Sequence, residues 1–178
     1  SATSLADTSY ADAVTQIVTG HWLDPSEMIL ELTETEAILN IAAALENLTR
    51  LRIRGFGLAI DDYGVGYSSM QALSRMPFTE IKIDRSFVTA AAGDPKYRLM
   101  VEHTVAVAHQ LGLKTVAEGV ETRAECELLS SLGCDRIQGY LVAKPVEGSG
   151  FLRWMLDRRA KLGPDAFNRP QETKRFGT

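Results

Sequence analysis

The sequence has few of the residues that thiolate and histidine centres require. Its 178 residues include only two cysteines and three histidines. Cys126 and Cys134 are spaced neither as a metal knuckle nor as a redox pair, so we expect ordinary buried or half-buried thiols. The three histidines lie outside every motif described below, and we interpret them as structural or solvated.

Long hydrophobic runs and an excess of positive charge are also absent. No apolar run approaches the roughly 20 residues of a membrane-spanning helix, and no basic segment followed by an apolar one begins the chain. We therefore expect a cytoplasmic domain with no membrane contact by this segment. A net charge of −4 gives no reason to expect DNA or another polyanion over the whole surface. Neither a Gly-rich phosphate loop nor a Ser-His-Asp order stands out.

Short apolar runs alternate with helical patterns along the chain. The runs predict strands at residues 28–32, 56–60, 80–83, 114–117 and 136–137. The helical patterns predict helices at about 10–19, from Thr33 or Thr35 to Gly55, in a short segment before Pro77, and at 94–111, 122–132 and 149–162. Continuous apolar strands separated by helices are typical of a parallel sheet covered by helices. We predict an α/β fold of the TIM-like (β/α) barrel type, in which we recognise five strands where a closed barrel has eight.

Each predicted strand ends in a polar motif, and these motifs contain Glu31, Asp61-Asp62, Lys82, Glu118 and Gln138. In a (β/α)₈ barrel the strand C-termini meet at one face, and catalytic groups come from several strands. Carboxylates that converge there are typical of a divalent-metal site with hard oxygen ligands. Lys82 alternates with Ile81 and Ile83, so it points into the barrel if those two pack against helices.

The motifs resemble the EAL family of cyclic di-GMP phosphodiesterases over about residues 1–154. The family's Glu-x-Thr-Glu, Asp-Asp-Phe-Gly-Thr-Gly-Tyr-Ser-Ser, Lys-Ile-Asp, Ala-Glu-Gly-Val-Glu and Gln-Gly-Tyr patterns occur at 31–34, 61–69, 82–84, 117–121 and 138–140, with Lys144-Pro145 following. Tyr63 and Val65 replace the family's Phe and Thr. The resemblance implies hydrolysis of cyclic di-GMP to linear pGpG at a two-metal site.

The resemblance implies roles for the metal ligands and the catalytic residues. The implied ligands of two Mg²⁺ or Mn²⁺ ions are Glu31, Asp61, Asp62 and Glu118. The implied catalytic residues are Lys82, Glu118, Glu121 and Gln138. We expect a depressed pKa for Lys82, which would let it polarise or deprotonate the attacking water.

The resemblance also implies substrate contacts and residues that order a loop. Asp84, Gln138 and Pro145 would contact the substrate. Glu34, Gly64 and Gly66 would order the loop at 61–69, since the glycines give it backbone freedom.

Structural interpretations of the same residues stay open. Asp61-Asp62 is also compatible with a helix cap and turn, and Lys82 with a structural ion pair inside the barrel. Glu34 and Glu121 suit a helix N-terminus, and Gln138 suits a polar strand end. Glu36-Ala37-Ile38-Leu39 mimics the family's Glu-Ala-Leu signature, but it lies inside a helical pattern and we reject it.

The sequence departs from the family at its front, where the Glu-Ala-Leu strand and the Asn-x-Ser strand are absent. We interpret it as part of a longer chain; strands supplied by a partner, or a natural fragment, are the alternatives. We expect an EAL-type domain at 1–162, incomplete at its N-terminus, and a polar tail at 163–178. The resemblance implies a homodimer and a sensor or GGDEF-type domain elsewhere in the parent chain.

Two other functions compete with the phosphodiesterase hypothesis. The first is an inactive module that binds cyclic di-GMP or another protein, which the absent front ligands favour. The second is a barrel lyase with Lys82 as a Schiff base, which fits the surrounding carboxylates less well.

Overall fold

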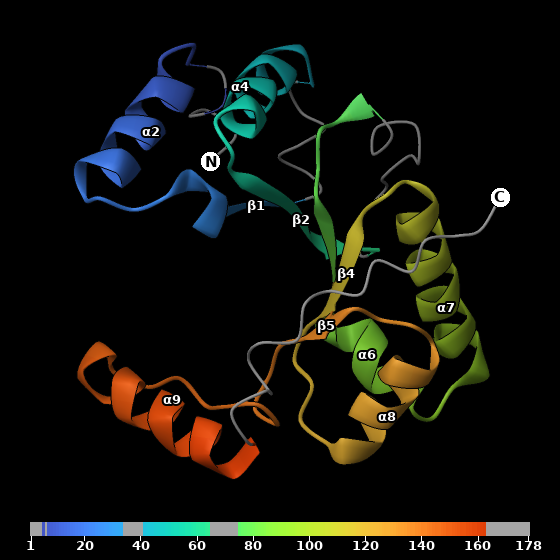
Figure 1. The fold of residues 1–178 in the computed structure, drawn as a ribbon. Helices are drawn as coiled ribbons and strands as arrows, with labels where there is room; N and C mark the ends of the chain where they lie inside the picture. The colour runs from blue at the N-terminus through green and yellow to red at the C-terminus, as the bar shows by residue number, and fades with distance from the viewer. Residues whose placement is uncertain (1–4, 6, 34–40, 65–74, 163–178) are drawn as a thin grey trace, which may run out of the picture. The chain divides into compact units, whose positions relative to one another are not determined.

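The computed structural model describes residues 5, 7–33, 41–64 and 75–162. The chain divides into two compact units, Ser1–Val142 and Ala143–Thr178. The first unit contains the sheet and most of the helices (Figure 1), and the second contains helix α9 (Gly148–Leu162). The expected boundary between residues 162 and 163 stays a prediction. Within the described residues, no helix combines the length and the apolar character needed to cross a membrane.

The first unit follows the predicted alternation of strands and helices. Its elements are α2 (Tyr10–Gly20), η1 (Pro25–Glu27), β1 (Ile29–Thr33), α4 (Ile41–Ile53), β2 (Gly57–Tyr63), β3 (Glu80–Ile83), α6 (Arg85–Ala91), α7 (Pro95–Gln110), β4 (Lys114–Ala117), α8 (Arg123–Ser131) and β5 (Arg136–Ile137). All five predicted strands are confirmed. Helix α6 was not predicted, and β2 continues to Tyr63 where we expected it to end at Ile60. The short helix before Pro77 and the cap at Thr35 fall mainly outside the described residues.

Local capping signals explain where several helices begin. Asp94 accepts a hydrogen bond from the Lys96 amide while Pro95 occupies the first helical position of α7. Thr122 and Glu125 form a reciprocal capping box at the start of α8. These side chains satisfy amide groups that a helix leaves unpaired at its N-terminus, so the sequence alone predicts both helix starts.

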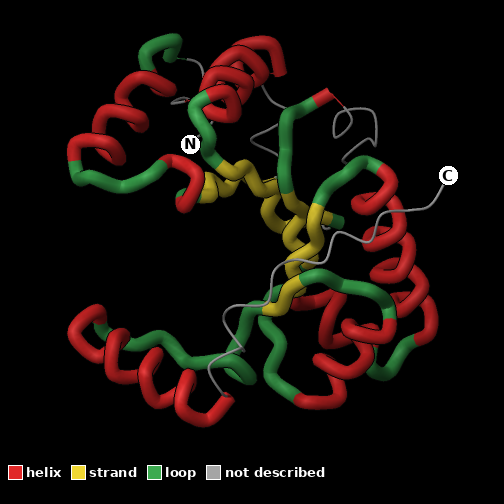
Figure 2. Tube along the Cα trace, in the orientation of Figure 1, coloured by secondary structure: helices red, strands yellow, loops and turns green. Residues whose placement is uncertain are grey.

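The five strands form one parallel sheet in the order β1-β2-β3-β4-β5. Figure 2 shows these strands, in yellow, side by side. Because the strands are parallel, their carboxyl ends lie at the same edge of the sheet. The register pairs Thr33 with Asp61 and Ile83 with Ala117, so β3 and β4 end level with each other and β2 runs two residues past the end of β1.

The two faces of the sheet differ in character. One face is apolar and packs against the helices in two clusters of buried residues that include Leu58, Ile60, Ile81, Ile83, Leu48, Ala108, Val101 and Ala117. The other face carries Glu31, Ala59, Glu80 and Lys82, because side chains alternate along a strand and paired residues share a face. The prediction that Lys82 points away from the helices is confirmed. We call the face that carries Lys82 and Glu31 the polar face.

Candidate active site

Lys82 lies at the centre of the polar face, near the end of β3. Only 4% of it is exposed, yet its side chain meets carboxylates from three other places in the chain. The Nζ atom lies 2.8 Å from Glu31 Oε2, 3.0 Å from Asp61 Oδ1 and 2.7 Å from Glu118 Oε1. An ammonium group has three N–H donors, so each can serve one carboxylate. The lysine therefore ties together strands β1, β2 and the end of β4.

A register shift in β2 places two consecutive aspartates at the site. Ile60 pairs with Ile81 and Tyr63 pairs with Ile83, so β2 uses one residue more than β3 between these pairs. Such a bulge re-aims side chains that would otherwise alternate between the two faces. Asp62 adopts a φ of 54°, in the left-handed region that few residues other than glycine, asparagine and aspartate enter. The sequence predicts this pair in a loop after the strand, and the structure instead places both aspartates within β2, at the register shift.

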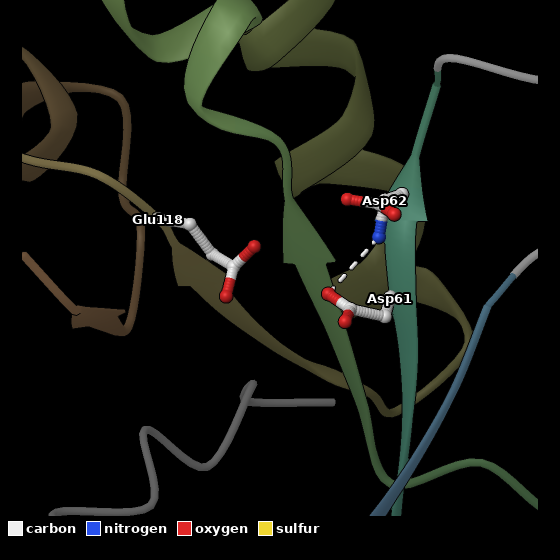
Figure 3. Close-up of side chains that lie close together, drawn as sticks. All are labelled: Asp61, Asp62 and Glu118. Atoms are coloured by element: carbon white, nitrogen blue, oxygen red, sulfur yellow. Dashed lines mark hydrogen bonds between the residues drawn. The ribbon is translucent and has the colours of Figure 1, made fainter.

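Three carboxylates lie close enough together to share a cation. One oxygen each of Asp61, Asp62 and Glu118 lies within 4.8 Å of the other two. Figure 3 shows Glu118 directed toward the aspartate pair across the end of β3, with the Asp62 amide donating to Asp61. Carboxylate oxygens are hard ligands of the kind that Mg²⁺ and Mn²⁺ prefer. Glu31 joins this group through Lys82, and its expected role as a metal ligand stays a prediction.

Burial and neighbouring charges shift the pKa values of the site in a consistent way. Burial raises the pKa of Glu118, against the opposing effect of Lys82. Burial also raises the pKa of Asp62, with added contributions from the charges of Asp61 and Asp84. Burial alone would lower the pKa of Lys82, but its hydrogen bonds to the three carboxylates outweigh burial and raise it. The carboxylates therefore act on Lys82 in the direction opposite to the depressed pKa that we expect beside bound metal ions, and that expectation stays a prediction.

The loop after β4, residues 118–121, is held from several sides. The Glu118 amide donates to Ile83 O at 3.0 Å, and the Val120 amide donates to Gln138 O at 3.0 Å. Gly119 has a φ of +64°, and a Cβ atom there would lie within 2.7 Å of three side-chain carbons of Arg85. Only glycine combines that backbone conformation with so close a neighbour. The loop thus fixes the direction in which Glu118 leaves the sheet.

Arg85 is a residue that sequence reasoning missed. Its guanidinium lies 2.8 Å from Glu121 Oε1, and its stem covers Gly119. Glu121 is accordingly paired with Arg85 and does not belong to the group around Lys82. Asp84 caps helix α6 by accepting hydrogen bonds from the amide and hydroxyl of Ser86. The pattern Asp84-Arg85-Ser86 carries this capping signal, and it was the one clue to α6 in the sequence.

The remaining predicted site residues lie farther out or outside the described residues. Gln138 is exposed, and its backbone links β4 to the loop at 118–121. Gly64 has a φ of +101° and packs against the ring of Phe87. Pro145 belongs to the second unit, and its substrate contact stays a prediction. Glu34 and Gly66, and also the rejected segment at 36–39, lie outside the described residues.

Comparison with known proteins identifies the family. A model of the EAL domain matches residues 1–145. The chain belongs to the EAL domain family. The cyclic di-GMP phosphodiesterase RocR of Pseudomonas aeruginosa is 43% identical over 148 residues, which are 83% of this chain and 38% of RocR.

Solved EAL structures share the fold. The PaMucR phosphodiesterase in its c-di-GMP complex is 42% identical and aligns with a TM-score of 0.79 over 85% of this chain and 61% of that one. Klebsiella pneumoniae BlrP1, in a manganese and cy-diGMP complex, is 33% identical with a TM-score of 0.73 over 78% of this chain and 35% of that one. The predicted EAL-type, TIM-like fold class is confirmed. The chain spans less than two thirds of the length of each of these three relatives.

Proposed function

We propose that this EAL domain hydrolyses cyclic di-GMP to linear pGpG. The observation that carries the proposal is the gathering of Asp61, Asp62 and Glu118 around buried Lys82 at the strand ends. Relatives named as cyclic di-GMP phosphodiesterases, and a PaMucR structure with c-di-GMP bound, support the same substrate.

We propose Mg²⁺ or Mn²⁺ as the cofactor, held by Asp61, Asp62, Glu118 and Glu31. The fit rests on the donor set, since one carboxylate oxygen from each of the first three residues lies within 4.8 Å of the other two. The BlrP1 complex with manganese supports this choice. Divalent cations bound there would neutralise charge on the phosphodiester and supply a nucleophile near neutral pH.

The chain's own residues have separate tasks in this proposal. Lys82 holds Glu31, Asp61 and Glu118 in one arrangement and places positive charge beside the phosphodiester. The bulge in β2 presents Asp61 and Asp62 together, and the loop at 118–121 aims Glu118 at them. Gln138, Asp84 and Pro145 contact the substrate. Glu121, which pairs with Arg85, assists catalysis. Glu34, Gly64 and Gly66 order the loop that follows Asp62.

We further propose that the domain works as a homodimer in the cytoplasm and is controlled by a sensor or GGDEF-type domain. The name of one relative, a bifunctional diguanylate cyclase and cyclic di-GMP phosphodiesterase, supports such a combination. Light scattering on the purified protein tests whether it is a dimer. A monomer at micromolar concentration would contradict this proposal.

The function is tested by incubating the purified protein with cyclic di-GMP and Mn²⁺ and separating the products by chromatography. We expect pGpG to accumulate, and we expect Glu118→Gln to lower turnover at least about 100-fold, because it removes a carboxylate from the metal-binding group. Glu102→Gln is the matched control, since Glu102 is exposed on α7 away from the site. Cyclic di-GMP bound without pGpG formation would instead identify a binding module.

A further inference from the structure

The buried ammonium of Lys82 and a divalent cation require the same two carboxylates, those of Asp61 and Glu118. Asp61 and Glu118 offer oxygens to a shared cation position, and the same two carboxylates make ion pairs of 3.0 and 2.7 Å with Lys82. Glu31 completes the set with a third ion pair at 2.8 Å. All three lysine donors therefore point at carboxylates that we assign to the metal site, and this overlap has a consequence for metal affinity.

The burial of Lys82 strengthens its repulsion of a cation bound to the same carboxylates. With 4% of Lys82 exposed, water screens its charge poorly, and the repulsion between an ammonium and a nearby divalent cation is correspondingly strong. The side chain enters the site from the middle of the sheet, between β2 and β4, so it reaches carboxylates on both sides. A cation bound by Asp61 and Glu118 must then share these carboxylates with Nζ or displace it.

We propose that Lys82 is a built-in competitor of the divalent cation at this site. Its ammonium holds Glu31, Asp61 and Glu118 together as a counter-ion and thereby weakens the binding of Mn²⁺ or Mg²⁺. When the metal enters, Nζ must either share Asp61 and Glu118 with the cation or withdraw from at least one of them. The inference rests on the metal site of the proposed function, but it concerns metal affinity and the stability of the fold, both of which are measurable without turnover.

The test compares Lys82→Met with the wild type and with Lys114→Met. Lys114 pairs with Glu80 in the register of β3 and β4, so it lies on the same face of the sheet but at the opposite end of the strand. The control thus removes one positive charge from the same face, at the start of the strand and away from the strand ends where the carboxylates lie. Mn²⁺ affinity is measured by titration calorimetry, and thermal unfolding is followed with excess chelator and with Mn²⁺.

Lys82→Met is expected to bind Mn²⁺ at least tenfold more tightly than the wild type. It is also expected to melt at a lower temperature in chelator, because the carboxylates lose their counter-ion, and to gain more from Mn²⁺ than the wild type does. Lys114→Met is expected to leave the affinity for Mn²⁺ unchanged, and Lys82→Arg to show no gain, because it keeps the charge. A Lys82→Met protein that folds only with Mn²⁺ supports the proposal, since the cation then replaces the ammonium.

Several results would overturn the proposal. One is unchanged or weaker Mn²⁺ binding by folded Lys82→Met; another is a Lys82→Met protein that stays unfolded in Mn²⁺. If neither the wild type nor Lys82→Met binds Mn²⁺, the metal site and this inference fail together. A wild type that forms pGpG while Lys82→Met gains no affinity leaves the proposed function standing and removes this inference alone.

Discussion

Asp61 and Asp62 are consecutive residues of β2, yet an oxygen of each lies within 4.8 Å of the same Glu118 oxygen. In a regular strand, neighbouring side chains point to opposite faces. The register shift between Ile60 and Tyr63, together with the positive φ of Asp62, removes that restriction here. The position of Asp62 therefore requires both a negatively charged side chain and a residue that tolerates a positive φ. Substitutions can separate these two requirements.

The first prediction separates these requirements at Asp62. Asp62→Asn keeps a residue type that tolerates positive φ but removes the charge, so we expect stability to change by less than about 1 kcal/mol while pGpG formation falls at least about 100-fold. Asp62→Val adds backbone strain of about 1–3 kcal/mol and is expected to lower stability as well. Urea unfolding and product chromatography measure the two effects. Equal stability of the two variants would contradict the backbone argument.

The second prediction concerns Gly119. Gly119→Ala places a Cβ against Arg85 at a φ of +64°, so we expect a loss of about 2 kcal/mol in unfolding free energy and reduced turnover, because Glu118 is the preceding residue. Gly93→Ala is the matched control, since nothing lies within 4 Å of its Cβ position. Arg85→Ala removes two of the three colliding carbons, so the double variant should lose less than the sum of the single losses. Strict additivity in urea unfolding would refute the contact.

The third prediction is a pH dependence at the other end of β4. Asp135 Oδ2 accepts hydrogen bonds from the amide and hydroxyl of Thr115, each at 2.8 Å, and lies 2.9 Å from His109 Nε2. Burial alone would raise the pKa of Asp135, but these hydrogen bonds outweigh burial and lower it. A lowered pKa in the folded state gives stability that is present above the unfolded value of about 4 and is lost as the pH falls through the folded pKa.

Asp135→Asn is therefore expected to be destabilised by about 1–2 kcal/mol at pH 7, and the difference from the wild type should shrink below about pH 4. Urea unfolding at several pH values measures this difference. Asp157→Asn, at an exposed position of α9, is the control and should track the wild type. A destabilisation of Asp135→Asn that is constant from pH 7 to pH 3 would show that ionisation is not its cause.

The fourth prediction concerns Glu80 and Arg136, which pair at 3.0 Å on the polar face of the sheet. The Glu80 side chain is 8% exposed and that of Arg136 is 41% exposed. Arg136→Met removes an ion-pair partner of a nearly buried carboxylate, and we expect it to cost about 2–3 kcal/mol. Replacing Glu80 by Gln in the Arg136→Met background should recover part of that loss, because the nearly buried negative charge is then gone. No recovery in thermal unfolding would contradict this explanation.

The order of the strands and of most helices, and the residue types at the strand ends, are local properties, and the sequence was sufficient to predict them. The apolar runs before Glu31, Lys82 and Glu118 predict parallel strands, because a strand buried between layers needs continuous apolar residues. The capping residues Asp94 and Thr122 mark helix starts within one turn. The missed helix α6 is short, and its only signal is the cap at Asp84.

Which of these side chains meet is a property of the packed sheet. The bulge at Asp61-Asp62 depends on how β2 pairs with β3, and the arrangement around Lys82 depends on the register of four strands. Glu121 stands beside Glu118 in the motif but pairs with Arg85, because the turn at Gly119 directs the two carboxylates to different partners. Local patterns carry propensity and residue type, whereas distances between strands follow from packing that involves residues far apart in the chain.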